Sequence, residues 1–269
     1  MRHPGIIFGA SVAAVLVVAA AAAPVLAPQS PVRQALRDTL RGPSGAHPFG
    51  QDRLGRDVLS RVLYGARVSL WVGVLAVGVS LTVGLVVGAV AGMRGGLVDE
   101  TLMRLIDILQ AFPGILLAIA FSAILGPSLV NVIIALSIIG WTGYARMARG
   151  QILLVRELEF VAAARALGGN DLRLTTWHVL PNILAPILVE ASFGMAGAIV
   201  AEASLSFLGL GTQPPSPSWG AMLNEARQYL LVAPHLTLFP GLAIMTVVLG
   251  LNLLGDGLRD LLDPRRAAR

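Results

Sequence analysis

The chain has 269 residues, of which 55% are hydrophobic and 13% charged, and its mean hydropathy is +0.76. This composition is too apolar for a water-soluble domain of this size and indicates a protein that lies within a membrane. The formal net charge is +5, and all 20 basic residues are arginine. A chain without lysine cannot carry the Gly-x-x-x-x-Gly-Lys-Ser/Thr phosphate loop, so it is not a P-loop ATPase on its own.

Cysteine and histidine usage limits the chemistry further. The absence of cysteine excludes disulfides, thiol nucleophiles and thiolate metal sites. The histidines lie far apart in the sequence, without ligand spacing, so we expect no metal and no cofactor: His3, His47, His178 and His235. The high pI comes from arginines scattered over loops, a pattern that favours membrane topology charge over nucleic-acid binding.

Six apolar runs are long enough to cross a bilayer, because a helix needs about 20 such residues to do so. They are 5–27, 69–92, 105–125, 129–147, 183–208 and 238–258. The sequence therefore predicts an all-α polytopic membrane protein with six transmembrane helices. The first run follows Arg2, as in a signal peptide, but it exceeds the usual apolar core of about 7 to 15 residues. This length favours a retained anchor helix.

The distribution of arginine gives an orientation. With six spans both termini lie on one side of the membrane, and a cytoplasmic placement leaves 12 of the 20 arginines inside. These are Arg2, Arg94, Arg104, Arg146, Arg149, Arg156, Arg165, Arg173, Arg259, Arg265, Arg266 and Arg269. The other eight include Arg53, Arg56, Arg61 and Arg67, so the bias toward the inside is modest.

Three connections hold most of the polar mass: 28–66, 148–182 and 209–237. In the first, residues 51–67 have helical spacing, with an apolar face of Leu54, Val58, Leu59, Val62 and Leu63. This pattern predicts an amphipathic helix along the membrane surface, with its arginines outward. The third connection opens with prolines and predicts a short helix near 219–231, in which Trp219 and Tyr229 suit an interfacial position.

The second connection contains EFVAAARALGGNDLRLTTWHVLPN, residues 159–182. Its alanine-rich beginning predicts a helix over 159–167 with an apolar stripe of Phe160, Ala163, Ala164 and Leu167. Gly168 and Gly169 are expected to end that helix, because glycine readily takes the left-handed conformation at a helix C-terminus. A small-faced helix of this kind suits insertion into a partner's groove, and it suits an interfacial helix that caps the bundle equally well.

A second short helix is expected to follow. Asn170 or Asp171 can cap its start. Pro181 is expected to end it after Val179, because the residue before a proline is pushed out of the α region. The segment is therefore predicted to be two short helices joined by a glycine break, between two membrane spans.

The same stretch resembles the cytoplasmic coupling loop of permease subunits of binding-protein-dependent ABC importers, whose pattern is E-A-A-x(3)-G-x(9)-I-x-L-P. The matching positions are Ala162, Ala163 and Ala164, then Gly168, then Leu180 and Pro181. Ala162 replaces the glutamate and His178 the isoleucine of the general pattern. Both replacements are typical of the branch that carries dipeptides, oligopeptides and nickel. Trp177 stands where that branch often has arginine.

Four further stretches resemble the C-type subunit of the dipeptide/oligopeptide permease pair. They are HPFGQDRLGRDVLSRVLYGARVSLWVG (47–73), MRLIDILQAFPGILLAI (103–119), AEASLSFLGLGTQPPSPSWGAML (201–223) and LGDGLRDLLDPR (254–265). The resemblance implies a type I ABC importer permease fold with six spans and both termini cytoplasmic, in a bacterial inner membrane. We divide the chain accordingly into an N-terminal helix with an extracytoplasmic segment (1–65), a permease domain (66–262) and a cytoplasmic tail (263–269).

The resemblance also implies partners and a role. A homologous B-type permease subunit, two ATP-binding subunits and an extracytoplasmic solute-binding protein would complete the importer, which would carry di- or oligopeptides, or related small solutes such as nickel chelates. The chain itself would not be an enzyme. The residues implied at the ATPase interface are Glu159, Ala162, Ala163, Ala164, Gly168, His178, Leu180 and Pro181.

Acidic residues within the spans are candidate functional groups, because burying a charge in a membrane is costly. Glu190 is a candidate for the transport pathway. For Glu202, its position near the outer end of the span favours a structural role. Asp107 is expected to pair with Arg104 one turn earlier. Pro113 is expected to kink the third span. Close helix packing is expected at a set of small residues: Gly194, Gly197, Ala198 and Ala201.

Two other function classes are compatible with six spans. A self-contained channel or secondary carrier would predict inverted repeats and discontinuous helices, and the sequence reveals neither. An intramembrane enzyme would need paired acids with histidine, a metal-ligand cluster or a serine-lysine pair, and the sequence supports none of them.

Overall fold

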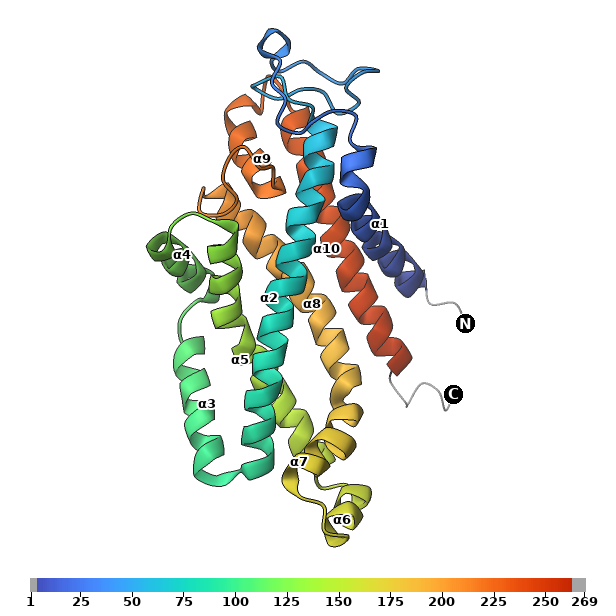
Figure 1. The fold of residues 1–269 in the computed structure, drawn as a ribbon, viewed down its shortest axis with the longest axis vertical. Helices are drawn as coiled ribbons and strands as arrows, with labels where there is room; N and C mark the ends of the chain where they lie inside the picture. Colours follow the sequence, from blue (N-terminus) through green and yellow to red (C-terminus); the bar gives the residue numbers. More distant parts are fainter. Residues whose placement is uncertain (1–3, 263–269) are drawn as a thin grey trace.

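A computed structural model of the chain describes residues 4–262, and these residues form helices, turns and one isolated bridge between Gln51 and Asp57. Within this part of the chain, five helices are long and apolar enough to span a membrane. They are α1 (Pro4–Leu26), α2 (Val58–Arg94), α5 (Leu129–Val155), α8 (Leu180–Phe207) and α10 (His235–Leu262). Figure 1 shows them running roughly along the long axis of the molecule.

The third crossing is a broken helix. α3 (Gly96–Gln110) and α4 (Gly114–Leu125) meet at an angle of 80°. Pro113 explains the break, because proline supplies no N–H to the helical ladder and restricts the residue before it. Counted as one span, the pair raises the total in the described residues to six, as predicted. The bend is sharper than the expected kink, and it makes α3–α4 a discontinuous helix that the sequence did not reveal.

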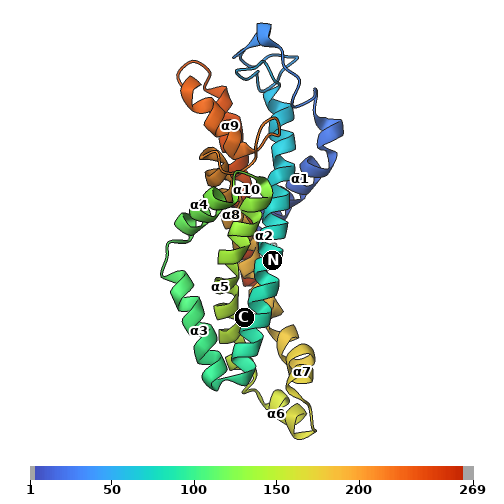
Figure 2. The same ribbon diagram turned by 60° about the vertical axis from the view of Figure 1, so that its left-hand side comes forward.

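Short elements lie at the two ends of the bundle (Figures 1 and 2). The first end, which we call the α9 end, holds loop 27–57 with η1 (Leu36–Asp38), together with α9 (Trp219–Ala226) and η3 (Arg227–Tyr229). The opposite end, the α6 end, holds α6 (Glu159–Ala166), α7 (Asp171–Arg173) and a π-helical turn, η2 (Leu174–Val179).

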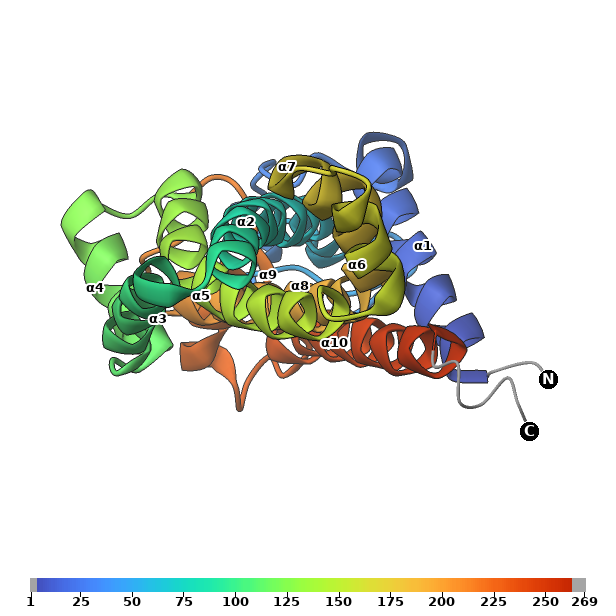
Figure 3. The same ribbon diagram turned by 90° about the horizontal axis from the view of Figure 1, so that it is seen from below.

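The N-terminal helix is part of the bundle. A Cβ atom added to Gly9 of α1 would lie 2.5 Å from the backbone nitrogen of Leu254 in α10, and one added to Gly250 would meet Val12. Helix α1 therefore lies directly against α10, and Figure 3 shows the two helices side by side when the bundle is viewed from below. Helix α2 runs across the proposed division at 65/66. Arg2, His3 and the proposed tail 263–269, with Arg265, Arg266 and Arg269, lie outside the described residues.

Helices α2 and α5 approach each other closely along a row of glycines. Gly84, Gly88 and Gly92 follow one another at intervals of four residues on the side of α2 that faces α5. A Cβ atom on Gly88 would lie 2.5 Å from the carbonyl oxygen of Ala145. Small residues allow two helix backbones to pack closely in a membrane. This row of glycines therefore packs α2 tightly against α5 toward the α6 end.

Candidate functional site

The predicted coupling segment, 159–182, is fixed to the bundle by a small apolar cluster. Val161, Leu174 and Val179 are fully buried. They pack with residues at the lower ends of α5 and α8, namely Ile152, Ile183 and Ile187, while side chains of α2 such as Leu85 and Met93 close the cluster. Of the predicted apolar stripe, only Ala164 packs against this cluster. The fully buried residue of α6 is Val161, which was not part of the predicted stripe. The segment therefore projects from the bundle on a firm base.

The glycine break has the geometry of a Schellman motif. Gly168 has φ = +88°, its N–H donates to the carbonyl of Arg165 (3.0 Å), and the N–H of Gly169 donates to that of Ala164 (3.1 Å). Glycine suits this position because other residues are strained at positive φ. Asn170 then caps α7, its side-chain oxygen accepting from the N–H of Arg173 (2.9 Å). The predicted helix, glycine break and cap are confirmed.

The expectation that Pro181 ends the second helix is wrong. From Asp171 the chain continues helically to Phe207, passing through the wide turn η2 just before the proline. In that turn the N–H of Leu180 donates to the carbonyl of Thr175, five residues back. A π-helical turn widens the ladder locally, which accommodates a residue without an N–H in the first turn of α8. The part of the segment from Asp171 onward is therefore continuous with α8.

The segment presents an exposed apolar surface at the α6 end. Leu167 is 90% exposed, Trp177 76% and Leu172 73%. Most predicted interface residues share this exposure: Glu159, Ala162, Ala163, Gly168 and Pro181 are exposed, while Ala164, His178 and Leu180 are half-buried. Large apolar side chains grouped on a projecting, well-anchored element are typical of a protein contact surface. We call Leu167, Leu172 and Trp177 the apolar tip.

Ion pairs brace the neighbouring parts of the α6 end. Arg149 of α5 forms a two-pronged contact with Asp99 at the start of α3, and Arg156 donates to the carbonyl of Gly92 (2.7 Å). Asp107 pairs with Arg146 of α5 (2.6 Å), so the expected pairing with Arg104 is wrong.

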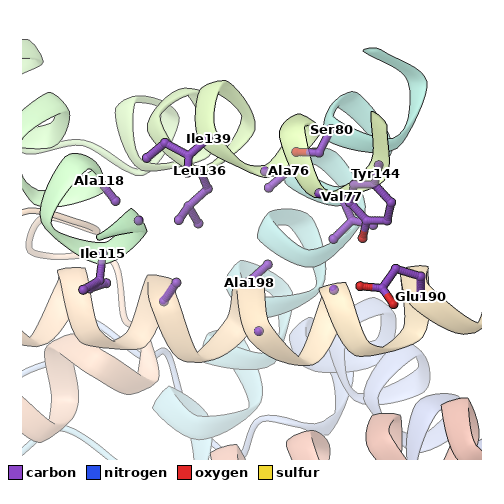
Figure 4. Close-up of a pocket in the computed structure, with 16 residues that line it drawn as sticks. Ala76, Val77, Ser80, Ile115, Ala118, Leu136, Ile139, Tyr144, Glu190 and Ala198 are labelled. Carbon is purple, nitrogen blue, oxygen red and sulfur yellow. The ribbon is translucent and has the colours of Figure 1, made fainter. Parts of the chain in front are cut away.

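A cavity of about 350 Å³ opens between α2, α4, α5 and α8. Gly194, Gly197, Ala198 and Ala201 of α8 all line it, together with Ile115 and Ala118 of α4. Gly194 does permit close packing, since a Cβ atom there would lie 2.0 Å from the Tyr144 hydroxyl oxygen. Gly197 faces open space instead. Figure 4 shows Glu190 at one end of this cavity, next to Tyr144.

Glu202, the second acidic residue of α8, has a geometry that fits the structural role. Its side chain is fully buried and accepts a hydrogen bond from the Ser206 hydroxyl (2.6 Å). The same hydroxyl accepts from the N–H of Thr212 (3.1 Å), so the carboxylate orders the turn that leads toward α9. Glu202 does not line the cavity between α2, α4, α5 and α8.

The expected surface helix at 51–67 is wrong. Helix α2 begins at Val58, where Asp57 caps it, and continues into the second span. Arg56 and Arg61 are buried rather than outward, while Arg53 alone of the cluster is exposed. The buried arginines are held by two carboxylates, those of Asp52 and Glu225.

This cluster also includes residues that are distant in the sequence, and no local sequence pattern predicts their contact. Glu225 comes from α9, and the indole of Trp219 in the same helix donates to the carbonyl of Val62 (2.9 Å). The position of Tyr144 at the cavity could not be predicted either, because Tyr144 is a single aromatic residue within an apolar run. The stretches 47–73 and 201–223, both singled out in the sequence, pack against each other here.

Comparison with known proteins agrees with these features. Residues 84–268 match the family described as binding-protein-dependent transport system inner membrane component. The chain is 49% identical over 243 residues to the dipeptide transport system permease protein of Alkalihalophilus pseudofirmus, covering 90% of this chain and 80% of that protein. It is 49% identical over 224 residues to the glutathione transport system permease protein of Pectobacterium atrosepticum, covering 83% of this chain and 74% of that protein. A putative peptide transport system permease protein of Brucella abortus is 47% identical over 265 residues, with 98% and 89% covered.

These matches decide between the function classes left open by the sequence. Proteins of this kind are multi-pass permease subunits of ABC transporters, whose ATPase activity resides in separate subunits. Neither an intramembrane enzyme nor a self-contained carrier fits that assignment. With its all-helical bundle, its projecting loop and a family match over more than two thirds of its length, the chain belongs to the binding-protein-dependent transport system inner membrane components.

Proposed function

We propose that this permease subunit forms half of the translocation pathway of a peptide importer and takes up the movement of the ATPase subunits through residues 159–182. The observation that carries the proposal is the apolar tip, which is highly exposed although the segment beneath it is firmly packed on α2, α5 and α8. An exposed apolar surface on a fixed base transmits force, because displacement of the tip moves the helices to which it is joined.

The continuous path from the tip into α8 supports this coupling. Helical structure runs without interruption from Asp171 to Phe207, so a tilt imposed at α7 is carried past the cavity to the far end of α8. Nucleotide-driven closure of two ATPase subunits would then switch the permease between two arrangements of rigid helices. The residues we assign to the interface are Glu159, Ala162, Ala163, Ala164, Gly168, His178, Leu180 and Pro181.

The transported solute is proposed from the relatives. The three cited permeases are named for dipeptide, glutathione and peptide transport, and dipeptides and glutathione share peptide bonds and a free amino group. We therefore assign small peptides as the solute class. A homologous B-type permease would cover the open side of the cavity, two ATP-binding subunits would dock at the α6 end, and a solute-binding protein would deliver peptides at the α9 end. Both termini would then be cytoplasmic.

The proposed docking of the ATPase subunits is tested by substituting a residue of the apolar tip. Leu167→Asp is expected to reduce co-purification of the ATPase subunits with the permease pair by about tenfold or more, because it places a charge in an apolar contact. The matched control is Leu231→Asp, which alters a leucine that is 96% exposed and follows η3 at the α9 end. If both variants retain the ATPase subunits equally, the coupling surface lies elsewhere.

The solute is tested with the complete importer. The reconstituted complex, with its binding protein, should hydrolyse ATP faster when dipeptide or glutathione is added. A nickel chelate as the sole stimulating solute would contradict the assignment of peptides while leaving the docking surface intact.

A further inference from the structure

The cavity between α2, α4, α5 and α8 combines an apolar wall with one acidic group. Its lining is almost entirely glycine, alanine and aliphatic residues, and the polar side chains among the described lining residues are Ser80, Tyr144 and Glu190. In Figure 4 the Glu190 carboxylate and the Tyr144 hydroxyl lie at the same end of the cavity, one from α8 and the other from α5. The cavity therefore offers its polar chemistry at one place.

Neither of these two groups forms a hydrogen bond or an ion pair within the described residues. The Tyr144 side chain is about nine-tenths buried, its residue being 8% exposed, and the hydroxyl forms no hydrogen bond with residues 4–262. The Glu190 carboxylate takes part in none of the ion pairs or hydrogen bonds found over the same residues. Arg259 of α10 lines a second hollow together with Glu190, and the two form no ion pair among the described residues.

Glu190 is exposed in the described chain, on a helix that is long and apolar enough to span a membrane. Acidic residues within such spans commonly face a water-filled cavity and mark the path of ions, protons or charged solutes. A buried hydroxyl without a partner costs about 1–3 kcal/mol. Both groups are satisfied together by a solute that carries a cation next to a hydrogen-bonding carbonyl. The amino end of a peptide has this arrangement, because its ammonium group is one carbon away from the first peptide carbonyl.

We propose that Glu190 and Tyr144 form a transit site for the amino terminus of the peptide, an inference that rests on the proposed peptide importer. The Glu190 carboxylate accepts hydrogen bonds from the ammonium group, and the Tyr144 hydroxyl donates to the first peptide carbonyl. The volume of about 350 Å³ lies within the size range of small-molecule sites. Because the remaining wall is small and apolar, the site reads the peptide backbone and tolerates different side chains.

Transport kinetics test the site in the reconstituted importer with its binding protein, using dialanine as the solute. Glu190→Gln is expected to lower kcat/KM by about tenfold or more, since a charge-assisted hydrogen bond is worth roughly 1.5–3 kcal/mol. Tyr144→Phe removes a hydroxyl that has no partner in the described chain, so the fold is retained and kcat/KM falls less, by about threefold to tenfold. Glu190→Asp should retain more activity than Glu190→Gln.

The matched control is Asp256→Asn. Asp256 is an exposed acidic residue of α10 beside Gly255, the residue that packs against Phe193 of α8, and it does not line the cavity. Its replacement should leave dialanine transport unchanged. Wild-type rates in Glu190→Gln and Tyr144→Phe would overturn the transit site. Failure of the wild-type complex to import any peptide would instead contradict the peptide importer itself.

A second measurement does not depend on transport. Because the chain has no cysteine, Ala198→Cys places a single reactive thiol of this subunit at the cavity wall. A cationic methanethiosulfonate reagent should modify it several-fold faster than an anionic one, and the preference should disappear in Glu190→Gln but persist in Asp256→Asn. Dialanine should slow the modification, and N-acetyl-dialanine should not. Equal rates for the two reagents, or equal protection by the two peptides, would contradict the site.

Discussion

Arg56 and Glu225, which are 169 residues apart in the sequence, form an ion pair that ties the loop before α2 to helix α9. The Arg56 side chain is 4% exposed and that of Glu225 18%. Asp52 accepts from the other side of the Arg56 guanidinium (2.6 Å), and Arg61 contacts both carboxylates more loosely. The α9 end is therefore held together by charges that are almost entirely removed from water.

Breaking this cluster should destabilise the protein strongly. Glu225→Gln leaves two buried guanidinium groups with one carboxylate, and the loss of one partner from a buried pair costs about 3–5 kcal/mol. Thermal unfolding of the purified permease in detergent measures the effect. The control is Arg41→Gln, which breaks an ion pair with Asp38 whose arginine is 67% exposed, and it should cost less than about 1 kcal/mol. Equal unfolding temperatures in the two variants would show that the buried cluster adds no stability.

Substitution of Gly168 should uncouple transport from ATP hydrolysis. At φ = +88° an aspartate is strained by about 1–2 kcal/mol, so the Schellman turn shifts and moves the α6 helix relative to α7. We expect Gly168→Asp to insert into the membrane normally while ATP hydrolysis no longer drives import in vesicles. Gly150→Ala provides the comparison, because a Cβ atom there meets open space. Normal import by Gly168→Asp would refute the coupling assignment.

Two glycines of α2 should respond to alanine with opposite signs. Gly88→Ala places a Cβ atom 2.5 Å from the Ala145 carbonyl oxygen, a backbone atom that cannot move aside, and should destabilise the α2–α5 pair by about 1–3 kcal/mol. Gly78→Ala meets no atom within 4 Å and should stabilise the helix by up to about 1 kcal/mol. Thermal unfolding of both variants in the same detergent tests the contrast, and a stabilised Gly88→Ala would argue against close contact.

The pair of Asp107 with Arg146 should contribute little. Their side chains are 55% and 48% exposed, and exposed ion pairs are worth about 0–1 kcal/mol. Asp107→Asn should therefore shift the unfolding temperature only slightly, whereas Asp99→Asn, which breaks the better buried contact with Arg149, should shift it more. The reverse order would mean that Asp107 has a role beyond this pair.

The sequence predicted the features that depend on local physics. The apolar runs located the spans because hydrocarbon thickness fixes their length. Gly168 and Asn170 predicted their own roles, since a left-handed turn and a side-chain cap involve only neighbouring residues. The helix predicted over 159–167 therefore agrees closely with α6.

The features that depend on distant partners could not be predicted. Arg56 and Arg61 fit an amphipathic helix until Glu225 is brought beside them by the fold. Tyr144 gave no signal within its apolar run, and its position opposite Gly194 is set by the packing of α5 on α8. The prediction that Pro181 ends the helix is wrong because the π-helical turn before it accommodates the missing N–H. Local rules for proline do not include such a turn.

The 80° break at Pro113 gives the cavity an adjustable wall. Helix α4 has 12 residues, so it is about 18 Å long, and it is joined to α3 at the break and to α5 through residues 126–128. A rotation of about 10° at the break would move Ala118, which is about 6 Å along the helix, by about 1 Å. Ile115 and Ala118 of this helix line the cavity at the end away from Glu190 (Figure 4), so a change of angle at Pro113 would reshape that end while the brace between Asp99 and Arg149 stays in place.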